Sequence, residues 1–301
     1  MPGAERRSPG LLWRRFWFEP GSAANLGFCR LVAAGLIFLQ FDAGGYRDWH
    51  EIDAVLWMPT PLFDLLGLRP AGADAMTALA RLCSTALLLT ALGLATRWSA
   101  AVAAVLALYL LGVPHNYGKV FHSDGVVPLI LVVLAVARSG DAWSLDRLLS
   151  RVRGRVARPD HAEYTWPVRL VWLLTALVFF AAGVAKLRLG GLEWMLSDQL
   201  SATLIGQHYR PVAPSTSIGL WIAAQPALCL LSAAGILAVE LLAPLALVST
   251  IARAVLVPAL VAFTASLPPL FAFGFPAFYA MFAFWVPWAS IGDYGRRRVV
   301  S

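Results

Sequence analysis

Long apolar runs separated by short polar stretches dominate this sequence of 301 residues. A helix needs about 20 mainly apolar residues to cross the hydrocarbon core of a bilayer. The pattern predicts an all-α integral membrane bundle of about eight transmembrane helices, in which the shorter spans are tilted or re-entrant. The predicted spans are Leu26–Phe41, Ala78–Ala95, Ser99–Val113, Val120–Ala137, Val168–Ala185, Pro226–Val248, Ala252–Leu267 and Pro269–Trp288.

The composition agrees with a membrane location. Hydrophobic residues make up 59% of the chain and charged residues only 14%, whereas soluble domains carry about 25% charged residues. We expect one transmembrane domain over residues 1–301, with residues 26–288 embedded and no large C-terminal soluble domain. The basic leader before the first apolar run is not followed by a persuasive small-x-small cleavage site, so we interpret that run as an uncleaved span and not as a signal peptide.

The basic residues gather in alternate loops. Fifteen of the 24 Lys and Arg residues fall on one predicted side, namely Arg6, Arg7, Arg14, Arg15, Arg97, Arg138, Arg147, Arg151, Arg153, Arg155, Arg158, Arg253, Arg296, Arg297 and Arg298. The opposite loops are relatively acidic, with Asp48, Glu51, Asp53, Asp64, Asp74, Glu193 and Asp198. Because cytoplasmic loops carry the excess of Lys and Arg, we predict that both termini are cytoplasmic. The net charge of +7 reflects this distribution, and nucleic acid is not an expected partner.

The arginine run of residues 151–158 favours a topology determinant that also touches anionic lipid, with a protein-binding site as the alternative.

The three cysteines, Cys29, Cys83 and Cys229, are isolated in apolar segments and form no C-x-x-C pair. We therefore expect buried structural cysteines and neither a metal site nor a thiol redox centre. On the outer side, residues 42–77 are expected to lie in the interface, and Leu192, Met195, Leu196 and Leu200 predict a short amphipathic helix.

Ionisable side chains inside a membrane are costly, so each is a candidate for function. The candidates within the predicted spans or at their ends are Arg30, Arg81, His122, Asp124, Lys186 and Glu240. We expect Arg30 and Arg81, which lie near helix ends, to extend to the polar interface. Glu240 lies among apolar residues, and we expect a structural role for it, either protonated or paired with a basic group such as Arg253 or Arg30.

Lys186 ends an apolar run in a chain whose only other lysine is Lys119, the remaining 22 basic residues being arginine. The predicted topology places Lys186 and His122 at the same outer depth, and Ser123 or Asp124 is expected to cap the helix that follows. Burial disfavours a charged ammonium, so an inward-facing Lys186 could act as a neutral base, which an arginine cannot do. The residues alone leave two interpretations open, an inward-facing base or a side chain that extends to the interface.

Three stretches carry a further signal. The first runs from His122 to a W-S-x-D ending formed by Trp143, Ser144 and Asp146, and the second is A-G-x-x-K-L followed by a tryptophan, at residues 182–194. The third, at residues 239–253, has an in-membrane glutamate followed by an arginine. Together with the early stretch F-C-R-L-V-A-A-G-L-I-F-L-Q-F, they resemble the vitamin K-dependent gamma-glutamyl carboxylase family, in particular its bacterial relatives that carry the HTTM membrane domain.

The resemblance implies that Lys186 is the base toward reduced vitamin K, a menaquinol-type quinol, and that His122 supports it through a hydrogen bond. Asp124 and Glu240 would be supporting polar residues. The substrate would be a glutamyl group of a protein or peptide on the outer face, deprotonated and then carboxylated, and the location a bacterial cytoplasmic membrane. In the seventh predicted span, where family members often have Phe-His, this chain has Phe263–Thr264.

Other function classes remain as alternatives. The chain could be a non-enzymatic membrane protein that binds lipid or quinone, or that assists the assembly of a partner. In that case Lys186→Arg would be tolerated, because only a positive charge is needed. If Lys186 is a base, the same substitution should abolish function. A transporter is disfavoured because no repeated pair of broken helices is present, and the missing C-x-x-C pair disfavours a thiol-dependent quinone reductase.

Overall fold

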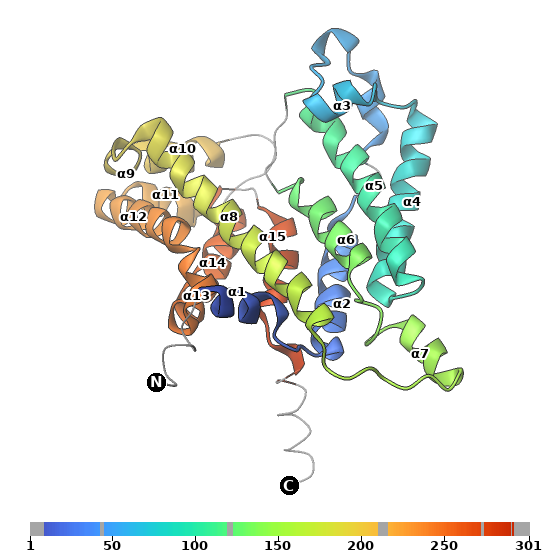
Figure 1. Ribbon diagram of the computed structural model, residues 1–301. Helices are drawn as coiled ribbons and strands as arrows, with labels where there is room; N and C mark the ends of the chain where they lie inside the picture. The colour runs from blue at the N-terminus through green and yellow to red at the C-terminus, as the bar shows by residue number, and fades with distance from the viewer. Residues whose placement is uncertain are drawn as a thin grey trace, which may run out of the picture. The chain divides into compact units, whose positions relative to one another are not determined.

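The computed structural model describes residues 9–42, 45–118, 123–209, 216–271, 274–289 and 291, and it is helical, with no β-strand over these residues (Figure 1). The helices are α1 (Pro9–Phe18), α2 (Ala23–Gln40), α3 (Pro61–Leu65), α4 (Ala73–Leu92), α5 (Thr96–His115), α6 (Val126–Val136), α7 (Leu145–Val152), α8 (Thr165–Gly190), α9 (Glu193–Leu196), α10 (Gln199–His208), α11 (Ser217–Ala223), α12 (Pro226–Leu242), α13 (Leu245–Val248), α14 (Thr250–Phe271) and α15 (Pro276–Phe282), with short 3-10 helices η2 (Arg47–Glu51), η3 (Ala54–Leu56), η4 (Ala162–Tyr164) and η5 (Ala283–Trp285).

Two compact units make up the chain. The first unit contains Met1–Val171 and Tyr279–Ser301, and the second contains Trp172–Phe278. In the first unit α2 packs against α4, α4 against α5, and α5 against α6. Small buried side chains at positions 100, 103, 104 and 107 of α5 recur every three or four residues, and small residues on one face let helix backbones approach closely in membrane bundles.

The second unit is built around the contacts of α10, α11, α12 and α14. Its core contains Leu200, Leu204, Cys229, Ala233, Leu267 and Phe271. The predicted amphipathic helix is divided into α9 and α10, which are separated by Ser197 and Asp198. The buried side chains of α10 are Leu200 and Leu204, four residues apart, so one face of this helix packs into the core.

Over the residues that the structure describes, five helices are long and apolar enough to cross a membrane: α2, α4, α5, α14 and the helix that contains α8. The count is six if α11 and α12, which meet at an angle of 102°, form one broken span. The predicted count of eight is therefore not confirmed. Within the predicted fourth span, α6 has only 11 residues. In the predicted eighth span, Pro269 belongs to α14, and the following α15 has 7 residues. Apolar content alone does not reveal where a helix begins or ends within an apolar run.

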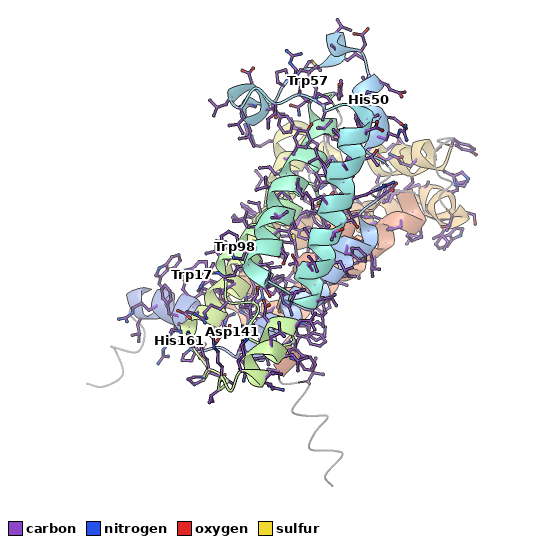
Figure 2. All side chains as sticks on the ribbon, turned by 90° about the vertical axis from the view of Figure 1, so that its right-hand side faces the viewer. Trp17, His50, Trp57, Trp98, Asp141 and His161 are labelled. Atoms are coloured by element: carbon purple, nitrogen blue, oxygen red, sulfur yellow. The ribbon has the colours of Figure 1, made fainter. Side chains whose placement is uncertain are left out.

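The two ends of the first unit differ in chemistry. Figure 2 shows Trp57 and His50, from the segment before α4, at one end, and Asp141 and His161 at the other. The first end carries η2, η3 and α3, and the second carries the arginine-rich segment around α7. The acidic and the basic segments therefore lie at opposite ends of the unit, as alternating spans require.

Arg30 has a different environment from the one predicted. Its side chain is fully buried and does not extend to an interface, whereas Arg81 is exposed on α4. The Arg30 guanidinium donates to the carbonyls of Thr90 at 2.8 Å and Ala91 at 3.2 Å, and also to those of Gly27 and Trp143. A cation at a helix C-terminus satisfies carbonyls that have no partner within the helix. Arg30 therefore caps the C-terminal end of α4.

The three cysteines, Cys29, Cys83 and Cys229, are buried and form no disulfide, as expected.

The W-S-x-D stretch forms the junction beside Arg30. Ser144 accepts a hydrogen bond from the backbone N–H of Arg147 at 2.9 Å and caps α7. Asp146 accepts bonds from the backbone N–H groups of Ala95 and Thr96, at 2.9 and 2.8 Å, and from the Thr96 hydroxyl at 2.7 Å. These N–H groups lie at the start of α5, where a carboxylate is favoured by the free donors and the helix dipole. The stretch therefore joins the ends of α4, α5 and α7.

Gly93 provides a test of this junction. It has a positive φ of 70°, and a Cβ atom added to it would clash with the Arg30 guanidinium and the Ser144 side chain. Gly67 has a φ of 60° and open space around it. An alanine at either position costs about 1–2 kcal/mol from the left-handed backbone, and only Gly93→Ala adds overpacking of about 1–3 kcal/mol.

We therefore expect Gly93→Ala to lower the thermal unfolding midpoint in detergent clearly more than Gly67→Ala does. Equal shifts for the two variants would contradict the close packing of Arg30 and Ser144 around Gly93.

Candidate functional site

The candidate site is an ion pair between α8 and α12 in the second unit. The Lys186 Nζ atom lies 2.7 Å from Glu240 Oε1 and 2.8 Å from Glu240 Oε2, and it donates to both. The Glu240 side chain is 3% exposed and that of Lys186 is 24% exposed. The lysine amine therefore turns toward α12, and the pair is accessible from the lysine side.

Glu240 continues the buried face of α12. Cys229, Ala233, Leu237 and Glu240 are the buried residues of this helix, and they follow one another at intervals of three or four. Apolar residues at this spacing form one helix face, and Glu240 is its last member. A carboxylate at this position would be strongly unfavourable without a cation beside it, and Lys186 supplies that cation.

The end of α12 is determined by Pro244. A proline has no N–H, so the Glu240 carbonyl lacks the hydrogen bond that residue 244 would donate in a continuous helix. Instead, the N–H of Ala243 donates to the Glu240 carbonyl at 3.3 Å. Glu240 thus lies in the last turn of α12, where the helix dipole disfavours a negative charge. This position increases the carboxylate's need for Lys186.

Gly183 allows the two helices to approach closely. It lies one turn before Lys186 on α8, and a Cβ atom added to it would lie 3.1 Å from Glu240 Cβ and 3.1 Å from the Leu241 side chain. Any larger residue would separate α8 from α12 beside the ion pair. The A-G-x-x-K spacing therefore has a physical reason, since the glycine brings the carboxylate within reach of the lysine three positions later.

Trp194 forms the neighbouring aromatic surface. Lys186 Nζ lies 5.3 Å from the centre of its ring, a distance typical of a cation–π contact. The amine therefore has a carboxylate on one side and an indole face near it. This arrangement can transfer a proton between an amine and an acid.

Glu240 pairs with a basic group, as one of the two expectations had it, but this group is Lys186 and neither of the two named examples, Arg253 and Arg30. Arg253 donates to the carbonyls of Ala246 at 3.0 Å and Leu247 at 3.2 Å, and its guanidinium lies 4.2 Å from the centre of the Trp172 ring. Arg253 thus satisfies carbonyls of the short helix α13. The sequence places Lys186 and Glu240 in separate spans, and only the close approach at Gly183 reveals that they pair.

His122 lies outside the described residues, so its predicted hydrogen bond to Lys186 stays a prediction. Asp124 is described, and its Oδ2 lies 3.4 Å from His115 Nε2. The expectation that Ser123 or Asp124 caps the next helix was wrong, because α6 has Gly125 at its N-cap and no side-chain capping bond. His115 was not among the predicted site residues, although a histidine that follows a proline at the end of a predicted span is a sequence signal for a polar contact there.

Metal ligation has no support in the described part of the chain, where no group of three or more His, Cys, Asp or Glu side chains is placed to hold an ion. In the seventh predicted span, Thr264 is fully buried and its hydroxyl donates to the Leu260 carbonyl at 2.8 Å. This hydroxyl therefore bonds within its own helix.

Comparison with known proteins gives one match. The family model described as the HTTM domain matches residues 18–288, which include the A-G-x-x-K-L stretch, the W-S-x-D stretch and Glu240. No curated protein and no solved structure matches the chain.

The ion pair can be tested with a double-mutant cycle of Lys186→Met and Glu240→Gln. Removing one partner of a fully buried pair costs about 3–5 kcal/mol, and we expect a smaller loss here because Lys186 is partly exposed. The double variant should recover much of the loss, since neither charge then remains unpaired. The measurement is the apparent free energy of unfolding in detergent.

Arg188→Ala is the matched control, because Arg188 is an exposed residue of the same helix two positions later. It should change stability by no more than about 0.5 kcal/mol. Strictly additive effects of the two single substitutions would show that the pair does not contribute to the fold.

The close approach at Gly183 can be tested against Gly235, a glycine of α12 with open space around it. Replacing a mid-helix glycine with alanine normally stabilises by about 0.5–1 kcal/mol. We expect this gain for Gly235→Ala and not for Gly183→Ala, where the methyl group meets Glu240 and Leu241. Gly183→Leu should lower the unfolding midpoint further, and an unchanged midpoint for that variant would exclude the tight contact.

Proposed function

The chain belongs to the HTTM domain family, and from this membership we propose that it is a membrane enzyme in which Lys186 takes a proton from a reduced quinone. The finer assignment within the family, a carboxylase-like activity, is part of this proposal. The observation that carries it is the pair of Lys186 and Glu240 beside Trp194.

The choice of lysine supports a chemical role. Arginine forms a stronger, bidentate ion pair with a carboxylate than lysine does, and this chain has arginine at 22 of its 24 basic positions. A purely structural cation facing Glu240 would be served well by arginine. Lysine differs because its amine can give up a proton and take it back, which a guanidinium in a protein does not do.

In this proposal Glu240 accepts the proton of the Lys186 ammonium group, which leaves a neutral amine. The pair has no net charge either as ammonium and carboxylate or as neutral amine and carboxylic acid, and moving one proton from Nζ to the carboxylate converts the first form into the second. In surroundings of low polarity, separated charges lose solvation while a neutral pair does not. The neutral form leaves a lone pair on Lys186 Nζ while Glu240 holds the proton.

Lys186 would then act as a general base. Its Nζ atom takes the proton of a quinol hydroxyl, an N–H bond forms as the O–H bond breaks, and the positive charge gained by the lysine balances the negative charge left on the oxygen. A correctly placed base contributes about 10²–10⁴-fold to a rate. The exposed side of Lys186 and the indole face of Trp194 suit a flat, apolar ring that arrives from the lipid.

The residues present fit a reduced quinone of the menaquinol type. When bound, it would supply the reducing equivalents that react with oxygen and the strong base that removes a proton from a glutamyl group, which carbon dioxide then traps. We propose a protein or peptide on the outer face as the glutamyl substrate, a bacterial inner-membrane location with both termini cytoplasmic, and a supporting hydrogen bond from His122.

A second candidate is a non-enzymatic protein that binds lipid or quinone or assists the assembly of a partner. It is favoured by the closed geometry of the pair, in which Nζ contacts both carboxylate oxygens and so links α8 to α12. This role needs a cation at position 186 but no proton transfer, and arginine would fulfil it.

The proposal is tested by incorporation of labelled bicarbonate into a glutamyl peptide in membranes that contain the protein and a reduced naphthoquinone. Lys186→Ala and Lys186→Arg should each lower incorporation by about 100-fold or more, because both remove the exchangeable amine. Arg188→Ala should retain the activity of the unmodified protein. All variants are first compared in expression level and unfolding midpoint.

Incorporation by Lys186→Arg at the level of the unmodified protein would contradict the base mechanism and favour the structural role. Equal incorporation by Lys186→Ala and the unmodified protein would remove Lys186 from the reaction altogether.

A further inference from the structure

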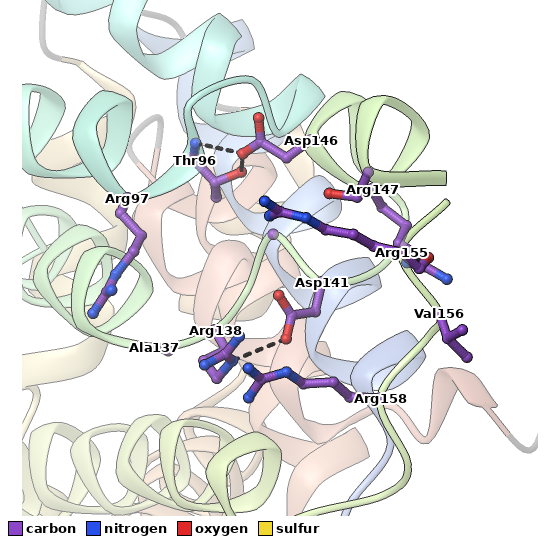
Figure 3. A pocket seen from close by; sticks show the side chains of 12 residues that line it. Thr96, Arg97, Ala137, Arg138, Asp141, Asp146, Arg147, Arg155, Val156 and Arg158 are labelled. Carbon is purple, nitrogen blue, oxygen red and sulfur yellow. Dashed lines mark hydrogen bonds and ion pairs between the residues drawn. The ribbon is translucent and has the colours of Figure 1, made fainter. Parts of the chain in front are cut away.

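A second charged site lies at one end of the first unit, in a hollow of about 300 Å³. Figure 3 shows the side chains that line it. They come from the start of α5, the segment after α6, α7 and the segment after α7, and five of them are arginines: Arg97, Arg138, Arg147, Arg155 and Arg158. Five guanidinium groups around so small a volume repel one another unless anions compensate them.

The carboxylates of the two acidic residues in the hollow, Asp141 and Asp146, already accept hydrogen bonds from other groups of the chain. Asp146 accepts three hydrogen bonds at the start of α5, two of them from Thr96. Asp141 accepts from Arg138 Nε at 3.0 Å and from the Tyr164 hydroxyl at 2.7 Å. Outside the hollow, Glu163 lies 3.5 Å from Arg138 and 3.9 Å from Arg158. Acidic groups of this chain therefore compensate Arg138 and, more weakly, Arg158.

Three arginines remain without such compensation. Within the described part of the chain, no carboxylate lies within ion-pair distance of Arg97, Arg147 or Arg155. Arg147 donates one bond to the Arg155 carbonyl at 3.0 Å, and Arg97 donates to the Ala135 carbonyl at 3.5 Å. Each guanidinium has five N–H donors, so most of these donors remain available on the wall of the hollow.

We propose that this hollow binds the phosphate group of a phosphate-bearing ligand. The forked donors of arginine match phosphate oxygens in pairs, and the volume is at the lower end of the range for small-molecule sites. The phosphate can belong to the headgroup of an anionic lipid or to a soluble phosphorylated molecule. The site is independent of Lys186, which lies in the other unit, so its test does not depend on the proposed enzyme activity.

A basic segment beside a membrane attracts anionic lipid in a general way, and the proposed site differs from that by depending on particular arginines. The chain offers a matched control, since Arg151 and Arg153 belong to the same basic segment, are exposed and do not line the hollow. Arg97→Gln/Arg155→Gln and Arg151→Gln/Arg153→Gln therefore remove equal charge, the first from the wall of the hollow and the second from outside it.

The test uses the full-length protein in phosphatidylcholine nanodiscs. Binding of inorganic phosphate and of glycerol 3-phosphate is measured by calorimetry, and retention of added phosphatidic acid by native mass spectrometry. We expect Arg97→Gln/Arg155→Gln to weaken binding by about tenfold or more, since charge-assisted hydrogen bonds from arginine to phosphate are among the stronger ones in proteins. Arg151→Gln/Arg153→Gln should weaken it by less than about threefold, because neither residue lines the hollow and their charges act only through general attraction to an anion.

Displacement of phosphatidic acid by glycerol 3-phosphate would identify a soluble ligand, and retention of the lipid would identify a headgroup; both outcomes support phosphate recognition. Equal weakening by the two double variants, or no binding of any probe by the unmodified protein, would overturn the proposal.

Ser150→Glu gives an independent variant if the first one unfolds. Ser150 lines the hollow on α7, so a carboxylate there should repel the phosphate and lower the affinity to a similar degree. Unchanged binding by a folded Ser150→Glu protein would likewise overturn the proposal.

Discussion

A charge inside a bundle of apolar helices is retained only where other groups of the same chain compensate it. This constraint accounts for much of the packing in both units. Arg30 is compensated by backbone carbonyls at the end of α4, and Arg253 by carbonyls of α13 and the ring of Trp172. Lys186 is compensated by the carboxylate of Glu240. Each cation joins segments that are separate in the sequence, so the charges determine which helix ends meet.

Much of the fold could be predicted from the apolar pattern, because a run of about 20 apolar residues has few alternatives to a helix in a membrane. Such runs correspond to α2, α4, α5, α8 and α14. The predicted spans and the helices differ where a helix ends inside an apolar run. Helix α12 ends at Leu242 within the predicted sixth span, and the short α15 begins at Pro276 within the predicted eighth span.

The candidate site was only partly predictable for a related reason. Lys186 and Glu240 each stood out as an ionisable group among apolar residues, but their pairing depends on how α8 and α12 pack. Gly183 and Pro244 determine that packing locally, the first by allowing close approach and the second by ending α12 two residues after Glu240. Asp124 shows the opposite failure. Its sequence position predicts a helix cap, but in the structure its carboxylate contacts His115. Rules based on neighbouring residues alone do not predict such a contact.

The two cations Arg30 and Lys186 differ in burial and in the group that compensates their charge. Arg30 is fully buried, donates to neutral carbonyls and stays charged, so it can only hold the end of α4 in place. Lys186 is partly exposed and faces a carboxylate, so a single proton transfer abolishes both charges without opening the pair. A side chain that stays charged suits a structural role at a helix end, whereas a side chain with an exchangeable proton at a partly exposed position suits the proposed role as a general base. The proposed role as a base would account for lysine at position 186, in a chain that has arginine at 22 of its 24 basic positions.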